Sequence, residues 1–192
     1  GINRTTNEDR WSVSGFLALA RANSPVWQTQ VGLYAGYYDG YLSDPYRSRD
    51  IRPDQRQQYA LTARSRYFLK GVNAALHANY RFYADDWGIE SHTVELEWHQ
   101  SLGDAFSVSP RVRYYSQSQA DFYVETDNLT RTGYQSSDYR MSPYGALSYG
   151  LGLSYDQPSY KLSAYAESYD SDGDYGLKSV EVESPALVRY TL

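Results

Sequence analysis

The residues of this chain that are best suited to chemistry are charged or imidazole side chains that recur at alternate positions in four consecutive segments. His77 and His99, two of the three histidines, lie in this pattern near Glu95 and Glu97. Imidazole and carboxylate groups together can bind a transition metal or act as an acid–base pair. The candidate residues are Arg64, Arg66, His77, Arg81, Glu95, Glu97, His99, Arg111 and Arg113.

Other features of the sequence disfavour catalysis by this cluster. It contains neither a nucleophile-elbow motif nor a His-Glu-x-x-His motif, and the third histidine, His92, falls on the opposite face of its segment. Two histidines on adjacent strands are more often hydrogen-bonded side chains than ligands. We therefore predict a protein that is not an enzyme and has no cofactor or metal. An enzyme with a site built from these His and Glu residues is kept as an alternative.

The elements that position these residues alternate with a period of two. Leu76, Ala78 and Tyr80, for example, are interleaved with His77 and Asn79. This period is typical of β-strands with two unlike faces. One face carries many charges and the other is apolar, which is typical of a bacterial outer-membrane barrel with a polar lumen. The predicted strands are residues 10–21, 26–38, 57–69, 73–84, 91–101, 106–119, 138–155, 160–169 and 177–192.

Composition agrees with this interpretation. The chain has 22 tyrosines, no cysteine, a mean hydropathy of −0.68 and a net charge of −5. No run approaches the ~18 apolar residues of a membrane-spanning helix. The negative charge disfavours a general nucleic-acid-binding surface, so we expect no nucleic-acid partner.

The connections alternate between short turns and longer polar loops, as in outer-membrane barrels whose short turns are periplasmic. Aromatic residues are expected near both rims, where lipid headgroups favour them. The first long loop mixes arginines and aspartates, and it is either an exposed charged loop or a salt-bridged lid folded over the barrel mouth. The predicted long loops cover approximately residues 39–56, 85–90, 121–137 and 170–176.

The end of the chain resembles the terminal signal that outer-membrane proteins present to the barrel-assembly machinery, because Ala186, Val188, Tyr190 and Leu192 alternate to the last residue. Nine strands are an odd number, whereas single-chain bacterial barrels have even numbers. Residues 1–192 are therefore expected to form a single domain that is the C-terminal part of a larger barrel. Bulges or strand ends are expected at Pro110, Pro143 and Pro185.

If the turns close at 71–72, near Gly88 and near Asp104, the charged residues form cross-strand rows. The rows are Arg64, Asn79, Glu97 and Arg111; then Arg81, Glu95 and Arg113; then Arg66, His77 and His99. Alternating charges across neighbouring strands stabilise such rows. One interpretation is that they plug the barrel, with every charge paired or hydrogen-bonded. The other is that, because arginine is in surplus, they form a constriction selective for anionic or zwitterionic solutes.

Several strings, in order, resemble a family of bacterial outer-membrane proteins of unknown function over roughly residues 10–192. They are Asp44-Pro-Tyr-Arg47, Arg52-Pro53 with Arg56, Asp85-Asp-Trp-Gly-Ile89, Ser91-His-Thr93, Glu95-Leu-Glu-Trp98, the segment from Tyr114 to Tyr123, and Ser137-Asp-Tyr-Arg140. The resemblance implies location in the outer membrane and a barrel architecture. It implies no activity and no catalytic residues.

Asp170, Asp172 and Asp174 alternate in a glycine-containing turn, a pattern that suits calcium. The later glutamate of an EF-hand is missing, so a solvated acidic loop is favoured.

The sequence thus predicts a channel for small polar or charged solutes, or a membrane scaffold. The expected partners are outer-membrane lipid, lipopolysaccharide and the assembly machinery. A sheath around a periplasmic lipoprotein or redox partner is an alternative, and so is a soluble barrel of inverted polarity, because alternation does not say which face is inside.

Overall fold

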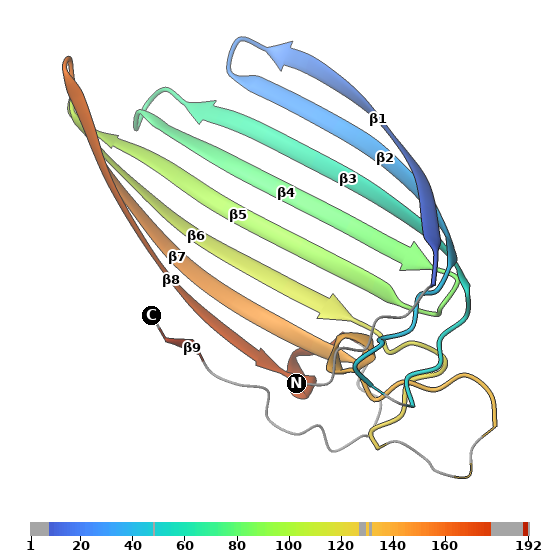
Figure 1. Cartoon of the computed structure of the whole chain (residues 1–192). Helices are drawn as coiled ribbons and strands as arrows, with labels where there is room; N and C mark the ends of the chain where they lie inside the picture. The colour runs from blue at the N-terminus through green and yellow to red at the C-terminus, as the bar shows by residue number, and fades with distance from the viewer. Residues whose placement is uncertain (1–7, 48, 127–129, 131, 178–189, 192) are drawn as a thin grey trace.

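The computed structural model describes residues 8–47, 49–126, 130, 132–177 and 190–191. These residues form one antiparallel sheet in which each strand pairs with the next along the chain (Figure 1). The predicted all-β, up-and-down architecture is confirmed. The strands are β1 (Arg10–Ser24), β2 (Trp27–Gly40), β3 (Gln55–Leu69), β4 (Ala74–Asp85), β5 (Glu90–Leu102), β6 (Phe106–Gln117), β7 (Tyr144–Gln157), β8 (Tyr160–Asp172) and β9 (Tyr190–Thr191).

The predicted limits of β1–β6 and of β8 agree with the structure to within three residues. The seventh strand was predicted from residue 138, but β7 begins only at Tyr144. The residues before it form the 3₁₀ helix η1 (Tyr139–Met141), because the Asp138 carboxylate accepts a hydrogen bond from the Arg140 backbone N–H. Most of the ninth predicted strand, including Pro185, lies outside the described residues.

Helices in the described residues are limited to η1 and a second 3₁₀ turn, η2 (Gly173–Tyr175). No described helix is long and apolar enough to cross a membrane.

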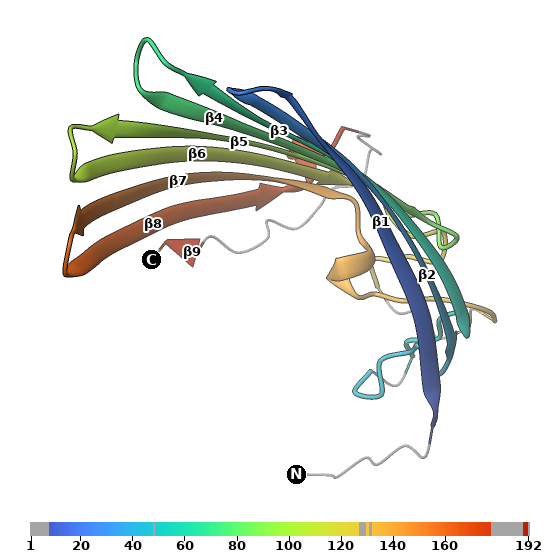
Figure 2. The same ribbon diagram turned by 90° about the horizontal axis from the view of Figure 1, so that it is seen from above.

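The sheet curves into a trough, with β1 at one edge and β8 and β9 at the other (Figure 2). Within the described residues β1 pairs only with β2, so the sheet is open. The described structure therefore has the curvature of a barrel wall without closure.

The charged face of the strands is the concave one. Helix η1 lies on the concave side of the sheet (Figure 2), and the Gln117 side chain donates hydrogen bonds to the carbonyl oxygens of Arg140 and Ser142 there. Side chains alternate along a strand, so Arg111 and Arg113 share the face of Gln117. The cross-strand register carries this assignment to the other strands.

The convex face carries large apolar side chains that are open to the surroundings. Leu17 is 74% exposed, Leu19 77% and Leu162 61%. The buried hydrophobic residues within the described strands are only alanines: Ala60, Ala74 and Ala146. The large buried apolar side chains of the described residues come instead from the connections: Trp87, Ile89, Phe122 and Met141.

The two described prolines for which irregularities were expected interrupt the strands in different ways. Pro143 immediately precedes β7, as predicted. Pro110 lies within β6, opposite Leu151 of β7. On its other side, the ladder between β6 and β5 is interrupted between Glu97 and Gln100 of β5, and the register is the same before and after the gap. A proline lacks the N–H that a ladder needs, which accounts for the interruption.

The register between β4 and β5 differs from the prediction by two residues. Asn79 lies opposite Glu95 rather than Glu97. The Asp85 carboxylate accepts hydrogen bonds from the backbone N–H groups of Trp87 and Ile89, each at 3.0 Å, and this centres the turn on Trp87 instead of Gly88. A register shift of two residues leaves every side chain on the same face of the sheet. The predicted cross-strand rows were therefore wrong, whereas the grouping of the charged residues on one face was right.

Candidate functional site on the concave face

All nine charged or imidazole residues that were singled out lie on the concave face, in rows set by the observed register. The first row runs across β3–β6 through Arg64, Asn79, Glu95 and Arg113. The second runs across β3–β8 through Arg66, His77, Glu97, Arg111, Gly150 and Glu167. Arg81 lies opposite Thr93, and His99 lies beyond the second row, so neither stands directly opposite its predicted partner.

A continuous polar network links these rows. The Arg66 guanidinium donates to the Asn79 side-chain oxygen at 2.9 Å, and the Asn79 amide donates to the Glu95 carboxylate at 2.9 Å. The Arg111 guanidinium approaches Glu95 at 3.7 Å and donates to Glu167 at 2.8 Å. These side chains are partly buried, where ion pairs and charged hydrogen bonds are stronger than in water.

Glu167, in β8, belongs to this network and was missed by the sequence analysis. It accepts hydrogen bonds from Arg111 and from the Tyr165 hydroxyl, the latter at 3.0 Å. Gly150 makes this possible, because a Cβ at that position would overlap the Tyr165 hydroxyl. The alternation of β8 does place Tyr165 and Glu167 on one face, but only the register brings them to Arg111.

Three arginines of the concave face are exposed and, within the described residues, form no ion pair: Arg64, Arg81 and Arg113. The Arg81 guanidinium lies 5.2 Å from the ring centroid of Tyr83. We call these three residues the arginine trio. Arg113 also lines a pocket of about 270 Å³, whose other lining residues are Tyr115, Tyr144, Ala146, Ser148, Glu167 and Tyr169. A guanidinium beside phenolic hydroxyls suits an anionic or zwitterionic guest.

His77, Glu97 and His99 are brought together, although the predicted His77–His99 row is replaced by diagonal contact. His99 Nε2 lies 2.9 Å from His77 Nδ1 and 3.3 Å from a Glu97 carboxylate oxygen, which is 4.0 Å from His77 Nδ1. Glu95, the fourth member of the predicted His/Glu cluster, instead contacts Asn79 and Arg111. His92 lies on the convex face, as predicted, with its Nδ1 2.8 Å from the Tyr80 hydroxyl.

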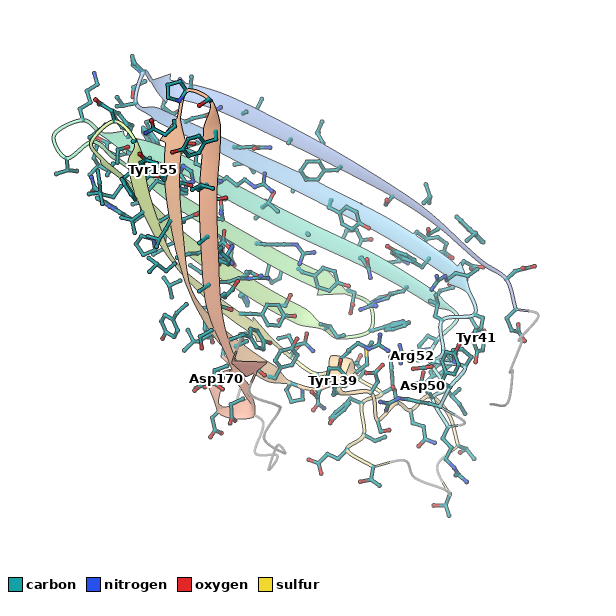
Figure 3. All side chains as sticks on the ribbon, turned by 60° about the vertical axis from the view of Figure 1, so that its left-hand side comes forward. Tyr41, Asp50, Arg52, Tyr139, Tyr155 and Asp170 are labelled. Carbon is teal, nitrogen blue, oxygen red and sulfur yellow. The ribbon has the colours of Figure 1, made fainter. Side chains whose placement is uncertain are left out.

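The described residues of two connections, 41–54 and 118–143, pack together at the end of the sheet where the long loops lie; we call them the rim loops. Arg52 lies at their contact, donating to Asp50 at 3.0 Å and to Asp138 at 2.8 Å. Figure 3 shows Asp50 and Arg52 at this end of the sheet, away from Tyr155. The first long loop is thus ion-paired to its neighbour, as the lid alternative requires.

Asp138 is the most strongly perturbed acid of the rim loops, with a side chain only 1% exposed. Burial by itself raises the pKa of Asp138, but hydrogen bonds from Arg140 and Arg52 outweigh burial and lower this pKa to about 2. The same hydrogen bond to Asp138 raises the pKa of Arg140. Both groups are therefore charged at neutral pH, and their pairing favours one arrangement of the loops.

An apolar cluster joins the β4–β5 turn to the rim loop of residues 118–143, and Leu42 of the other rim loop packs against it; we call this cluster the loop core. Trp87 meets Phe122 edge to face, with ring centroids 5.2 Å apart, and the Arg56 guanidinium lies 4.2 Å from the Trp87 centroid. Gly88, beside Trp87, has a φ of +86° that favours glycine. The loop core consists of Trp87, Ile89, Ala120, Phe122 and Met141.

Two of the three aspartates of the predicted cation loop use their carboxylates for hydrogen bonds within the protein. The Asp170 carboxylate accepts a hydrogen bond from the Tyr175 hydroxyl, and the Asp172 carboxylate caps η2 through the Asp174 N–H. Among the described residues, only His77, Glu97 and His99 form a group with three potential metal-binding atoms within 4.8 Å of one another.

Comparison with known proteins identifies a family without identifying a function. The family model described as "Protein of unknown function (DUF3570)" matches residues 1–182. No curated protein and no solved structure matches the chain.

Proposed function

Because the chain belongs to the DUF3570 family, whose function is unknown, we propose a function from the geometry. The sheet forms part of the wall of a bacterial outer-membrane barrel, and its concave face lines a passage for small anionic or zwitterionic solutes. The observation that carries this proposal is the contrast between the exposed apolar convex face and the exposed arginine trio on the concave face.

The convex face supports contact with lipid. Fully burying one leucine or valine side chain is worth about 1.5–3 kcal/mol, so a continuous apolar face has a strong tendency to leave water. Strand β4, one of the two shortest of β1–β8, has 12 residues. A strand of that length rises about 40 Å and, tilted by about 45°, spans close to the hydrocarbon thickness of a bilayer.

Placement in a bilayer requires that the sheet be closed. An unpaired backbone N–H or C=O group in hydrocarbon costs several kcal/mol. In the part of the chain that the structure describes, one edge of the 15-residue strand β1 is unpaired. In the proposed barrel this edge is paired by a further strand, and the rim loops lie at the mouth that faces lipopolysaccharide.

The paired and unpaired charges have different roles in the proposed passage. Arg111 is neutralised by Glu95 and Glu167, so it mainly stabilises the wall. The arginine trio has no such partner among the residues that the structure describes, and its positive potential attracts anions and repels cations. Arg113 also lines a pocket with tyrosine side chains, where we expect the carboxylate or phosphate group of a solute to bind transiently.

Planar-bilayer recordings of the full-length protein test this function. We expect open channels whose reversal potential in a salt gradient indicates preference for anions. Replacing Arg64 and Arg113 together by alanine should shift the reversal potential toward cation selectivity, because two unpaired positive charges leave the passage.

Arg21→Ala provides the matched control. Arg21 is also an exposed arginine, but its position in β1 places it on the convex face. This variant should retain the selectivity of the unmodified protein. An absence of conductance, or an equal shift in the control and in the double variant, contradicts the proposed function.

A further inference from the structure

We propose that His77, Glu97 and His99 form a binding site for one divalent transition-metal ion of the zinc type, open toward the concave side of the sheet. The three residues come from adjacent strands, His77 from β4 and the other two from β5. They are partly exposed, with side-chain exposures of 26%, 27% and 36%, respectively. An ion and an external ligand can therefore reach them.

The separations between the potential ligand atoms fit a tetrahedral ion. With metal–ligand bonds of about 2.0–2.1 Å, the ligand atoms of a tetrahedral site lie about 3.3 Å apart. The observed separations among His77 Nδ1, His99 Nε2 and the Glu97 oxygen are 2.9, 3.3 and 4.0 Å. Small side-chain rotations are enough to accommodate the ion.

The charge of Glu97 is the second observation that points to a cation. On the concave face, Glu95 and Glu167 contact Arg111, and Asp85 contacts Arg56. Glu97, among the described residues, contacts no arginine or lysine, and its ion-pair partners are only the two histidines. A partly buried carboxylate without a fixed cation is costly, and a divalent ion supplies the missing positive charge.

A hydrogen bond with Ser109 orients the His99 ring for metal binding. The Ser109 hydroxyl lies 2.9 Å from His99 Nδ1. When Nδ1–H donates to this hydroxyl, the lone pair of the imidazole is on Nε2, the atom that faces His77 and Glu97. Hydrogen bonds of this kind from the second nitrogen of an imidazole orient metal-binding histidines.

The ligand types indicate the class of ion. Two imidazoles and one carboxylate suit zinc and its neighbours in the first transition row, whereas calcium and magnesium prefer oxygen ligands alone. Three protein ligands leave the fourth position for water or a solute group. The site is thus suited to binding a ligand that enters from the concave side.

Metal titration of the full-length protein in detergent, freed of metal by chelation, tests the site. We expect one Zn²⁺ per chain by calorimetry, and one Co²⁺ with the visible absorption of a tetrahedral ion. His77→Ala and His99→Ala should each weaken Zn²⁺ affinity at least 100-fold, and Ser109→Ala about 10–100-fold.

The third histidine supplies the control. His92→Ala removes an imidazole from the convex face of β5 and should bind Zn²⁺ as the unmodified protein does. If either alanine variant fails to fold by circular dichroism, Glu97→Gln takes its place, with the same expected loss. The proposed site is wrong if the unmodified protein binds neither Zn²⁺ nor Co²⁺. It is also wrong if folded variants of His77, His99 or Glu97 bind Zn²⁺ with unchanged affinity, or if His92→Ala loses as much affinity as they do.

Discussion

Arg111 and Arg113 are two positions apart on the same face of β6, yet their surroundings are opposite. The Arg111 guanidinium lies between two glutamates, whereas Arg113 is exposed and faces a pocket that contains tyrosines. Their roles therefore differ although their sequence context is alike. The bond from Arg111 to Glu167, 56 residues away, makes the difference.

Asp138 gives a prediction for acid stability. Its pKa is about 2 in the folded protein against an ordinary value of 3.8, so the group stabilises the fold above about pH 4. This contribution, about 2 kcal/mol, is lost as the pH falls from 4 toward 2, because protonation weakens the bonds from Arg52 and Arg140. Urea unfolding at a series of pH values measures the loss.

The control for this effect is Asp138→Asn, which keeps the shape of the side chain but has no charge to titrate. The free energy of unfolding of this variant should depend less steeply on pH between 4 and 2 than that of the unmodified protein. Identical slopes for the two proteins would show that Asp138 is not the group responsible.

At the scale of elements, one short turn determines which residues meet. The Asp85 carboxylate closes the β4–β5 turn around Trp87, and this sets Asn79 opposite Glu95 and His77 opposite Glu97. Centring the turn one residue later would separate Glu97 from His77 and place it opposite Asn79. The candidate metal site thus depends on a hydrogen bond at the far end of its strands.

The loop core predicts a local effect of mutation. Trp87→Ala removes a side chain that is 3% exposed, and such a loss typically costs about 3–5 kcal/mol. Because the loop core joins the β4–β5 turn to the rim loop of residues 118–143, with Leu42 of the other rim loop packed against it, the loops should detach while the sheet persists. The endoproteinase Asp-N, which cleaves on the N-terminal side of aspartate, should then cut before Asp50, which is 5% exposed in the intact structure.

Tyr46→Ala is the matched control, since Tyr46 belongs to the same rim loop as Asp50 and is 85% exposed. Its digestion pattern should equal that of the unmodified protein. Protection of the Arg49–Asp50 bond in the Trp87 variant, or cutting there in the control, would contradict a stabilising role for the loop core.

At the scale of the whole molecule, the two faces of the sheet should respond differently to the same substitution. Leu33, at the middle of β2, is 57% exposed on the convex face, while Gln30 in the same strand lies on the concave face. Leu33→Arg should destabilise the protein in lipid vesicles by about 2–4 kcal/mol, as for arginine facing lipid at the bilayer midplane.

Gln30→Arg adds the same charge to a polar face and should cost much less. Urea unfolding of the full-length protein from lipid vesicles compares the two variants. Equal stabilities would contradict contact of the convex face with lipid.

Alternation along the chain was enough to predict β1–β6 and β8 and the grouping of their side chains, because the direction of a side chain on a strand follows from the local backbone. Leu76, His77 and Asn79 could be assigned to their faces on this basis alone. The family resemblance is confirmed as membership of an uncharacterised family, while the outer-membrane location stays a proposal.

The folded sheet was needed to establish which face is concave, which residues stand opposite one another, and that Glu167 contacts Arg111. It also decided that Trp87 and Phe122 form a core outside the sheet. These features depend on turn geometry and on contacts between distant segments. A period of two carries no information about either, since a register shift of two residues leaves the pattern unchanged.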